Sequence, residues 1–187
     1  MTEAEFVAAV LRNPVNATIL ARLPQLEASD AWLVSGALFQ TVWNVITHRA
    51  PNYGIKDYDV FYFEPDTSWD AENDVIVRAK HLFADVDTAI EVRNQARVHL
   101  WYEAKFEAPY PPLVRSTDGI DHFLMHNAQV GIRARGESYE IYAPHGFEDI
   151  ARMIVRPNRT PNFRADRYRE KADRWKSLWP EITILPA

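Results

Sequence analysis

The sequence predicts an α/β to α+β fold, in which a mixed sheet is flanked by helices. Apolar residues recur at positions 39, 42, 43 and 46, which is the spacing of one helix face. In residues 57–63, Asp57 and Asp59 would lie on one face of an extended chain, and Tyr58, Val60 and Tyr62 on the other. This alternation is typical of a strand. Segments of strand length and segments of helix length follow one another along the chain, and this order favours helices packed on a sheet.

The composition excludes several classes of protein. A chain of 187 residues can bury a core of its own, and its 47% hydrophobic content is too high for a disordered acidic chain. The absence of cysteine rules out disulfides, thiol nucleophiles and cysteine-bound zinc. The net charge of −5 argues against non-specific DNA binding, which requires a basic surface.

No signal for export or membrane insertion is expected from the sequence. The first residues carry Glu3 and Glu5 before a short apolar run and lack a basic leader region. All apolar runs are shorter than a membrane span requires. We therefore expect a cytoplasmic protein, from a bacterium, with no membrane partner.

The first third of the chain is predicted as helix, helix, strand, helix, strand. Helices are expected near residues 6–10 and 16–26, the second interrupted at Pro24. A buried strand over 31–34 enters a tight turn at Ser35–Gly36, and a helix follows.

A further helix and a long strand are expected next. Thr67–Asp70 has the form of a capped helix start, with acids in the first turn and basic residues in the last. Residues 90–102 alternate apolar and polar side chains and predict a strand, with a hairpin or a bulge at Asn94–Gln95 as open alternatives.

Prolines at 109, 111 and 112 suggest a boundary. We therefore divide the chain into a core, residues 1–105, and a C-terminal α+β extension, residues 106–187, packed on it. In the extension, helices are expected over 117–126, 146–155 and 165–178, and strands over 130–133 and 139–142 around a turn at Gly136.

Three acidic residues are predicted to converge. Asp57 and Asp59 lie two positions apart in one strand, so they share a face. Glu91 stands between apolar residues on the next predicted strand. Three carboxylates facing one another repel unless cations neutralise them, and oxygen ligands favour Mg²⁺ or Mn²⁺. Two such ions can bridge a triphosphate and stabilise leaving pyrophosphate.

The turn before the first long helix is the second part of this arrangement. At Ser35, Gly36 and Ala37 a strand ends and a helix begins, and the free N–H groups of a helix start can hold a phosphate. For an isolated D-x-D pattern, the alternative to a metal site is a pair of solvent-exposed acids. A glycine turn before it and an acidic strand after it, in this order, favour a site.

This arrangement resembles the nucleotidyltransferase superfamily typified by polymerase beta. SGALFQTVWN, GIKDYDVFYF, EVRNQARVHLWYE and IYAPHGFEDI are similar to a bacterial nucleotidyltransferase-like family, over nearly the whole chain. The resemblance implies a nucleotidyltransferase-type sheet and metal ligation by Asp57, Asp59 and Glu91. Ala37 stands where the superfamily usually has a second Gly or a Ser, and Asp57 follows Gly36 by an unusually long gap.

The function expected from these residues is transfer of a nucleoside monophosphate from an NTP to an acceptor, using two metal ions. The acceptor is left open between a small molecule, a protein and RNA. Arg93 and Arg97 are expected on the face of Glu91, where they either contact the nucleotide or form salt bridges on a polar sheet face. Two rival functions are a nucleotide sensor without turnover, which Ala37 favours, and a metal-dependent phosphohydrolase.

Overall fold

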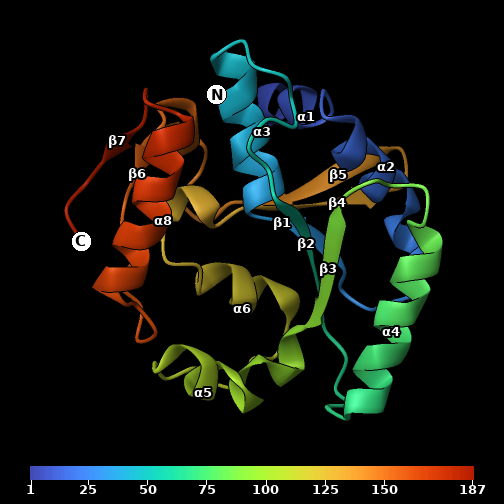
Figure 1. Cartoon of the computed structure of the whole chain (residues 1–187). Helices are drawn as coiled ribbons and strands as arrows, with labels where there is room; N and C mark the ends of the chain where they lie inside the picture. Colours follow the sequence, from blue (N-terminus) through green and yellow to red (C-terminus); the bar gives the residue numbers. More distant parts are fainter.

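The computed structural model describes residues 1–187 as a five-stranded mixed sheet flanked by helices (Figure 1). The strand order is β3-β2-β1-β4-β5. Strands β2 and β3 are parallel and are connected through helix α4, whereas the other neighbours are antiparallel. The strands of this sheet are β1 (Trp32–Val34), β2 (Asp57–Tyr62), β3 (Ala89–Asn94), β4 (Gly131–Arg135) and β5 (Ser138–Tyr142). The predicted fold class is therefore confirmed.

Eight α-helices and three short 3₁₀-helices complete the fold, with a separate pair of short strands near the C-terminus. The α-helices are α1 (Glu3–Val10), α2 (Pro14–Arg22), α3 (Gly36–Ile46), α4 (Trp69–Leu82), α5 (Tyr102–Phe106), α6 (Ser116–Asp121), α7 (Glu148–Ala151) and α8 (Ala165–Leu178). The 3₁₀-helices are η1 (Leu23–Leu26), η2 (Gln95–Leu100) and η3 (His126–Ala128), and the parallel pair is β6 (Ile154–Val155) with β7 (Thr183–Ile184).

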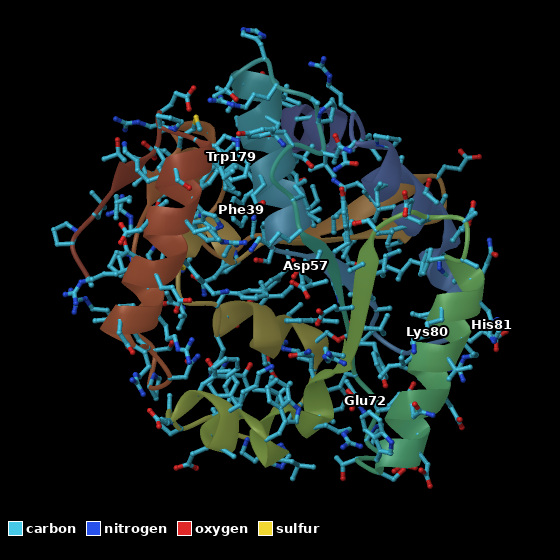
Figure 2. The ribbon with its side chains drawn as sticks, viewed as in Figure 1. Phe39, Asp57, Glu72, Lys80, His81 and Trp179 are labelled. Atoms are coloured by element: carbon cyan, nitrogen blue, oxygen red, sulfur yellow. The ribbon has the colours of Figure 1, made fainter.

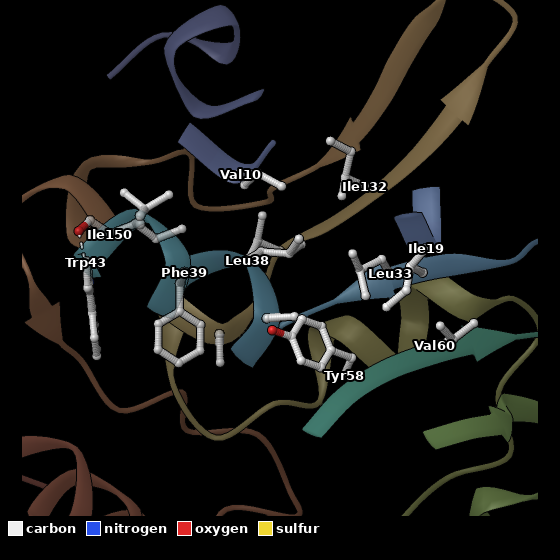
Figure 3. Close-up of a cluster of buried hydrophobic side chains, with 14 of the residues drawn as sticks. Val10, Ile19, Leu33, Leu38, Phe39, Trp43, Tyr58, Val60, Ile132 and Ile150 are labelled. Carbon is white, nitrogen blue, oxygen red and sulfur yellow. Dashed lines mark hydrogen bonds between the residues drawn. The ribbon is translucent and has the colours of Figure 1, made fainter. Parts of the chain in front are cut away.

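The two faces of β2 differ in chemistry, as the alternation predicts. Tyr58, Val60 and Tyr62 are buried on one face and belong to the main hydrophobic core. Figure 3 shows Val60 and Tyr58 in this core with residues of β1 and α3. Burying such side chains is the main favourable term in folding. The opposite face of β2 carries Asp57 and Asp59, and it is therefore free for chemistry.

Helix α3 is buried on nearly all sides, although the sequence predicted a single apolar stripe. Gln40, Thr41 and Asn44 are buried with the apolar residues, while Ile46 of the predicted stripe is 40% exposed. Helix α8 covers one side of α3 through edge-to-face aromatic contacts such as Phe39–Trp175, with ring centroids 5.0 Å apart. These contacts place α8 beside the start of α3.

The predicted strand over residues 90–102 is wrong beyond Asn94. The Asn94 side chain accepts from the N–H groups of Glu64 and Ala96 and donates to the carbonyls of Glu64 and Asp66. These bonds end β3 and turn the chain into η2. Alternation of side chains continues in the sequence, but the backbone no longer pairs as a strand.

Two helices of the extension are shorter than predicted. Helix α6 ends at Asp121, whose carbonyl accepts from the side chains of Gln129 and Asn158 instead of continuing the helix. Helix α7 ends before Met153, which has a left-handed φ of 54°, and residues 154–155 form β6. Helix α8 and the hairpin at Gly136 agree with the prediction.

The division at residue 105 stays a prediction. Strands β4 and β5, from the second part, join the sheet of the first part beside β1. One hydrophobic cluster of 32 buried residues includes side chains from both parts. No helix combines the length and the apolar character needed to cross a membrane.

Candidate functional site

The strand register brings two of the predicted acids side by side. Asp59 is the direct partner of Glu91 in the parallel β2–β3 pair, and Asp57 lies two residues earlier on the same face. Figure 2 shows Asp57 near the centre of the molecule, at the start of β2. Because neighbouring strands are only about 4.8 Å apart, Asp59 and Glu91 project from adjacent points of the sheet. The strand register thus brings Asp59 and Glu91 together, as the order of the strands suggested.

A cleft of about 350 Å³ opens on this face of the sheet. Asp59 and Glu91 line it, together with Ser35 from the turn before α3. Its basic lining residues come from β3, α5 and the region of α8: Arg93, Lys105, Arg164, Arg167 and Lys171. Its aromatic lining residues are Phe61, Trp101, Tyr102, Phe106, Tyr110, Phe123 and Trp175. A cleft with carboxylates, cations and flat rings suits a ligand that is both anionic and aromatic.

The charges at the carboxylate end act on one another. Burial, and to a smaller extent the nearby carboxylates of Asp57 and Glu91, raise the pKa of Asp59 to about 7 against the opposing effects of Lys171 and Arg93. Lys171 is exposed to solvent within the cleft. The protein around its ammonium group lowers the pKa of Lys171, and the negative charge of Asp59 partly offsets this effect. Asp59 therefore lies between carboxylates that raise its pKa and cations that lower it.

The turn between β1 and α3 is backbone-strained. Ser35 has φ 57° and ψ −116°, a conformation that costs energy for a residue with a side chain. Its N–H donates to the carbonyl of Val130 at 2.8 Å, which ties the turn to the residue before β4. The side chain of Ala37 is buried in the core, so Gly36 and Ala37 can contribute to a ligand site only through their backbone N–H groups.

The two predicted arginines separate. Arg93 lies on the face of Glu91, lines the cleft and pairs with Glu91 at 3.2 Å. Arg97 lies in η2, outside the lining of the cleft, and its guanidinium pairs with Glu72 of α4 at 3.1 Å. Figure 2 shows Glu72 between α4 and the end of β3. Because β3 ends at Asn94, the expectation that Arg97 shares the face of Glu91 is wrong.

The basic residues that α8 and its N-cap bring to the cleft were not predicted from the sequence. Arg164, Arg167 and Lys171 lie three and four positions apart, which places them along one helix face. The apolar stripe of Tyr168, Ala172 and Trp175 runs beside them. A basic stripe next to an apolar stripe was visible in the sequence, but nothing in the sequence showed that it faces Asp59.

The carboxylates of the cleft are separate from one another in this structure. No three histidine, aspartate or glutamate side chains gather closely enough to share a metal ion. The donors nevertheless fit chemically, since Asp57, Asp59 and Glu91 offer only oxygen from one sheet face. Burial and the carboxylates of Asp57 and Glu91 raise the pKa of Asp59, an effect that a bound cation would oppose. Glu91 would have to turn away from Arg93 to complete the group.

Comparisons with known proteins bear on the family and the fold. A family model described as "Nucleotidyltransferase" matches residues 21–184. A protein solved by NMR, described as revealing a CCA-adding enzyme head domain, has a TM-score of 0.79 and 25% sequence identity to this chain. The match covers 100% of this chain and 97% of that one. The comparison with curated proteins gives no match.

Proposed function

We propose that this chain, which belongs to a nucleotidyltransferase family, transfers a nucleoside monophosphate from an NTP to an acceptor and releases pyrophosphate. The observation that carries the proposal is the pairing of Asp59 with Glu91 on the wall of a cleft that also holds five basic side chains. Carboxylates beside cations suit a metal-bound polyphosphate better than either group alone.

In the proposed reaction, an oxygen of the acceptor attacks the α-phosphorus of the NTP. The new P–O bond forms as the bond from the α-phosphorus to the bridging oxygen breaks, and pyrophosphate leaves with that electron pair. The acceptor proton passes to the Glu91 carboxylate. Mg²⁺ or Mn²⁺ ions held by Asp57, Asp59 and Glu91 would stabilise the charge that develops on phosphate oxygens.

The basic residues of the cleft have separate roles in this proposal. Arg93, beside Glu91, and Lys171, near Asp59, are positioned to bind phosphate oxygens. The backbone N–H groups after Ser35 would add neutral donors at the start of α3. Arg97 is assigned no contact, because its partner is Glu72.

The acceptor remains to be identified among small molecules, protein side chains and RNA. The similar NMR structure is described as the head domain of a CCA-adding enzyme, so an RNA end belongs in any panel of acceptors. A labelled NTP with Mg²⁺ and such a panel would identify the group that receives the nucleotide.

Replacement of Asp59 tests the proposed reaction directly. We expect Asp59→Asn to lower Mg²⁺-dependent pyrophosphate release by at least about 100-fold, because the variant loses a metal-binding charge but keeps its shape. Pyrophosphate is measured with each of four NTPs, with Mg²⁺ and then with Mn²⁺. Asp173→Asn, an exposed acid on α8, is the matched control and should keep full activity.

Three results would contradict the proposal. Full activity of Asp59→Asn would exclude this site. Nucleotide binding without pyrophosphate release would favour a sensor, the function that Ala37 suggests. Release of inorganic phosphate would favour a phosphohydrolase, although the apolar residues Val60 and Phe61 that follow Asp59 differ from the small residues usual in the aspartate-nucleophile type.

A further inference from the structure

Two buried polar atoms in the cleft have no hydrogen-bond partner. They are Oε1 of Gln95, in a residue 1% exposed, and Nε1 of Trp175, in a residue 4% exposed. Both side chains line the cleft. Nearly all buried polar atoms in proteins are paired, because an unpaired one loses its bonds to water. One atom can only accept and the other can only donate, so each requires a different group from a ligand.

Gln95 is the first residue of η2, directly after β3, and its side chain lines the cleft. Its Nε2 donates to the carbonyl of Arg93 at 3.3 Å, which orients the amide and leaves Oε1 free. A Cβ on Gly119 would lie 2.2 Å from this oxygen, so the glycine provides the space that the carbonyl occupies. The site therefore offers one fixed acceptor to an N–H donor.

Aromatic rings surround this part of the cleft. Phe61, the register partner of Arg93, stacks on Phe123 with centroids 5.4 Å apart and planes at 16°. Tyr110 packs between Tyr102 and His122 at 4.3 and 4.8 Å. Flat rings beside a single acceptor suit a nitrogen heterocycle, and the nucleobases carry their N–H groups at different positions on their edges, so one fixed acceptor can favour some bases over others.

Trp175 presents its indole N–H from another wall. It lies one turn after Lys171 on α8 and packs edge-on against Phe39 of α3, one turn after Ser35. Lys171 is the basic residue that acts on Asp59. Trp175 thus lies on the same helix as Lys171, and a phosphate oxygen is the acceptor that the proposed reaction would supply to its unpaired N–H.

We propose that these two atoms orient the nucleotide, with its base donating an N–H to Gln95 Oε1 and a phosphate oxygen accepting from Trp175 Nε1. Gln95 is then the residue that discriminates between bases, and Trp175 binds any nucleoside triphosphate. This inference rests on the proposed function, since it assumes that the ligand is an NTP.

Binding measurements on the full chain separate the two contacts. The ligands are ATP, GTP, CTP, UTP and inorganic tripolyphosphate, each with Mg²⁺, and affinity is measured by calorimetry. The wild-type protein should prefer some bases over others by roughly 2- to 10-fold, the effect of one hydrogen bond. Gln95→Met should reduce this preference to less than about twofold and leave tripolyphosphate affinity unchanged.

Trp175→Phe should have the opposite effect. We expect the affinities for all four NTPs and for tripolyphosphate to fall by a common factor of roughly 2- to 10-fold, with the base preference retained. Arg169→Gln, an exposed residue of α8 outside the cleft lining, is the control and should bind as wild type.

A second variant keeps the test valid if Gln95→Met fails to fold. Gly119→Ala lies in helix α6, and its methyl group would displace the flexible end of Gln95 without touching the aromatic rings. It should reduce base preference as Gln95→Met does. Thermal melts of each variant confirm that the fold is intact.

The failures of the two proposals are distinguishable. A wild-type protein that binds no NTP overturns both the proposed function and this inference. An active wild-type protein with equal affinity for all four bases, or variants that bind as wild type, overturns this inference alone. If Gln95→Met and Trp175→Phe weaken every ligand equally, the separate roles are wrong.

Discussion

At the scale of single residues, Asn94 determines where the basic and amide groups of the cleft lie. Its four side-chain hydrogen bonds end β3 and hold the segment around Glu64 and Asp66. Its backbone N–H donates to Glu72 at 2.9 Å. The residues on either side, Arg93 and Gln95, both line the cleft. A buried amide of this kind acts on ligand binding through its neighbours.

Removing the Asn94 amide should destabilise the protein strongly. We expect Asn94→Ala to lower the free energy of unfolding by about 2–4 kcal/mol, because several buried backbone groups lose their partner. Urea denaturation measures the change. Asn52→Ala, an exposed loop residue, should stay within about 0.5 kcal/mol of wild type. A loss below about 1 kcal/mol in Asn94→Ala would show that water replaces these bonds.

The residues that sequence reasoning could place were those set by local pattern. Asp57 and Asp59 share a face because strands alternate, and Glu91 joins them because β2 and β3 are parallel. Residues placed by distant contacts were missed. The partners of Asn94 lie about 30 residues earlier in the chain, and Lys171 faces Asp59 only because α8 packs on α3.

At the scale of elements, helix α4 connects the two strands that carry the acids. Its start is fixed by Ser68, whose Oγ accepts from the N–H of Ala71 at 3.3 Å. The preceding turn is held by Asp66, which accepts from the N–H of Ser68. The predicted motif begins at Thr67, whereas the observed N-cap is Ser68. The helix start was therefore predicted to within one residue. Two adjacent hydroxyl residues cannot be distinguished by pattern alone.

The identity of the cap is testable by paired substitutions. We expect Ser68→Ala to lower the free energy of unfolding by about 1 kcal/mol, the usual effect of removing an N-cap. Thr67→Ala, at an exposed neighbouring position, should change it by less than about 0.5 kcal/mol. Chemical denaturation of both variants gives the comparison. A larger effect at Thr67 would mean that the helix starts one residue earlier in solution.

At the scale of the whole molecule, the free energy of unfolding should change with pH through His126, which stacks on His145. The rings of His126 and His145 lie 3.7 Å apart and are parallel to within 2°. Burial lowers the pKa of His126, as do the charges of His145 and Arg156, against the opposing effect of Asp149. A histidine whose pKa is lower in the folded state is held neutral by folding, so its protonation favours unfolding.

The sign of this effect gives a pH prediction. The contribution of His126 is complete above the unfolded pKa of about 6.5 and is lost as pH falls below it. We expect His126→Gln to reduce the loss of stability between about pH 7.5 and pH 5.5. Melting temperatures of both proteins at the two pH values measure it. An unchanged loss would contradict the prediction, and His81→Gln on the exposed side of α4 is the control.

Two expectations at this scale stay predictions: the location in the bacterial cytoplasm, and the division of the chain at residue 105. Amino-acid composition and the length of apolar runs bear only indirectly on the location in the cell. The division at residue 105 rested on the prolines near residue 110. These prolines mark a turn of the chain but carry no information on how β4 returns to the sheet. Strand pairing between distant segments is set by the final packing.

The walls of the cleft come from distant parts of the chain: Ser35 and Asp59 from the first third, Lys171 and Trp175 from near the C-terminal end. During synthesis, all three acids leave the ribosome long before α8 exists. A chain that has reached only residue 160 therefore has the carboxylates proposed to bind metal but lacks the wall that α8 forms. In the proposed function the nucleotide contacts both walls, so bound nucleotide would stabilise the finished protein against unfolding and leave growing chains unaffected.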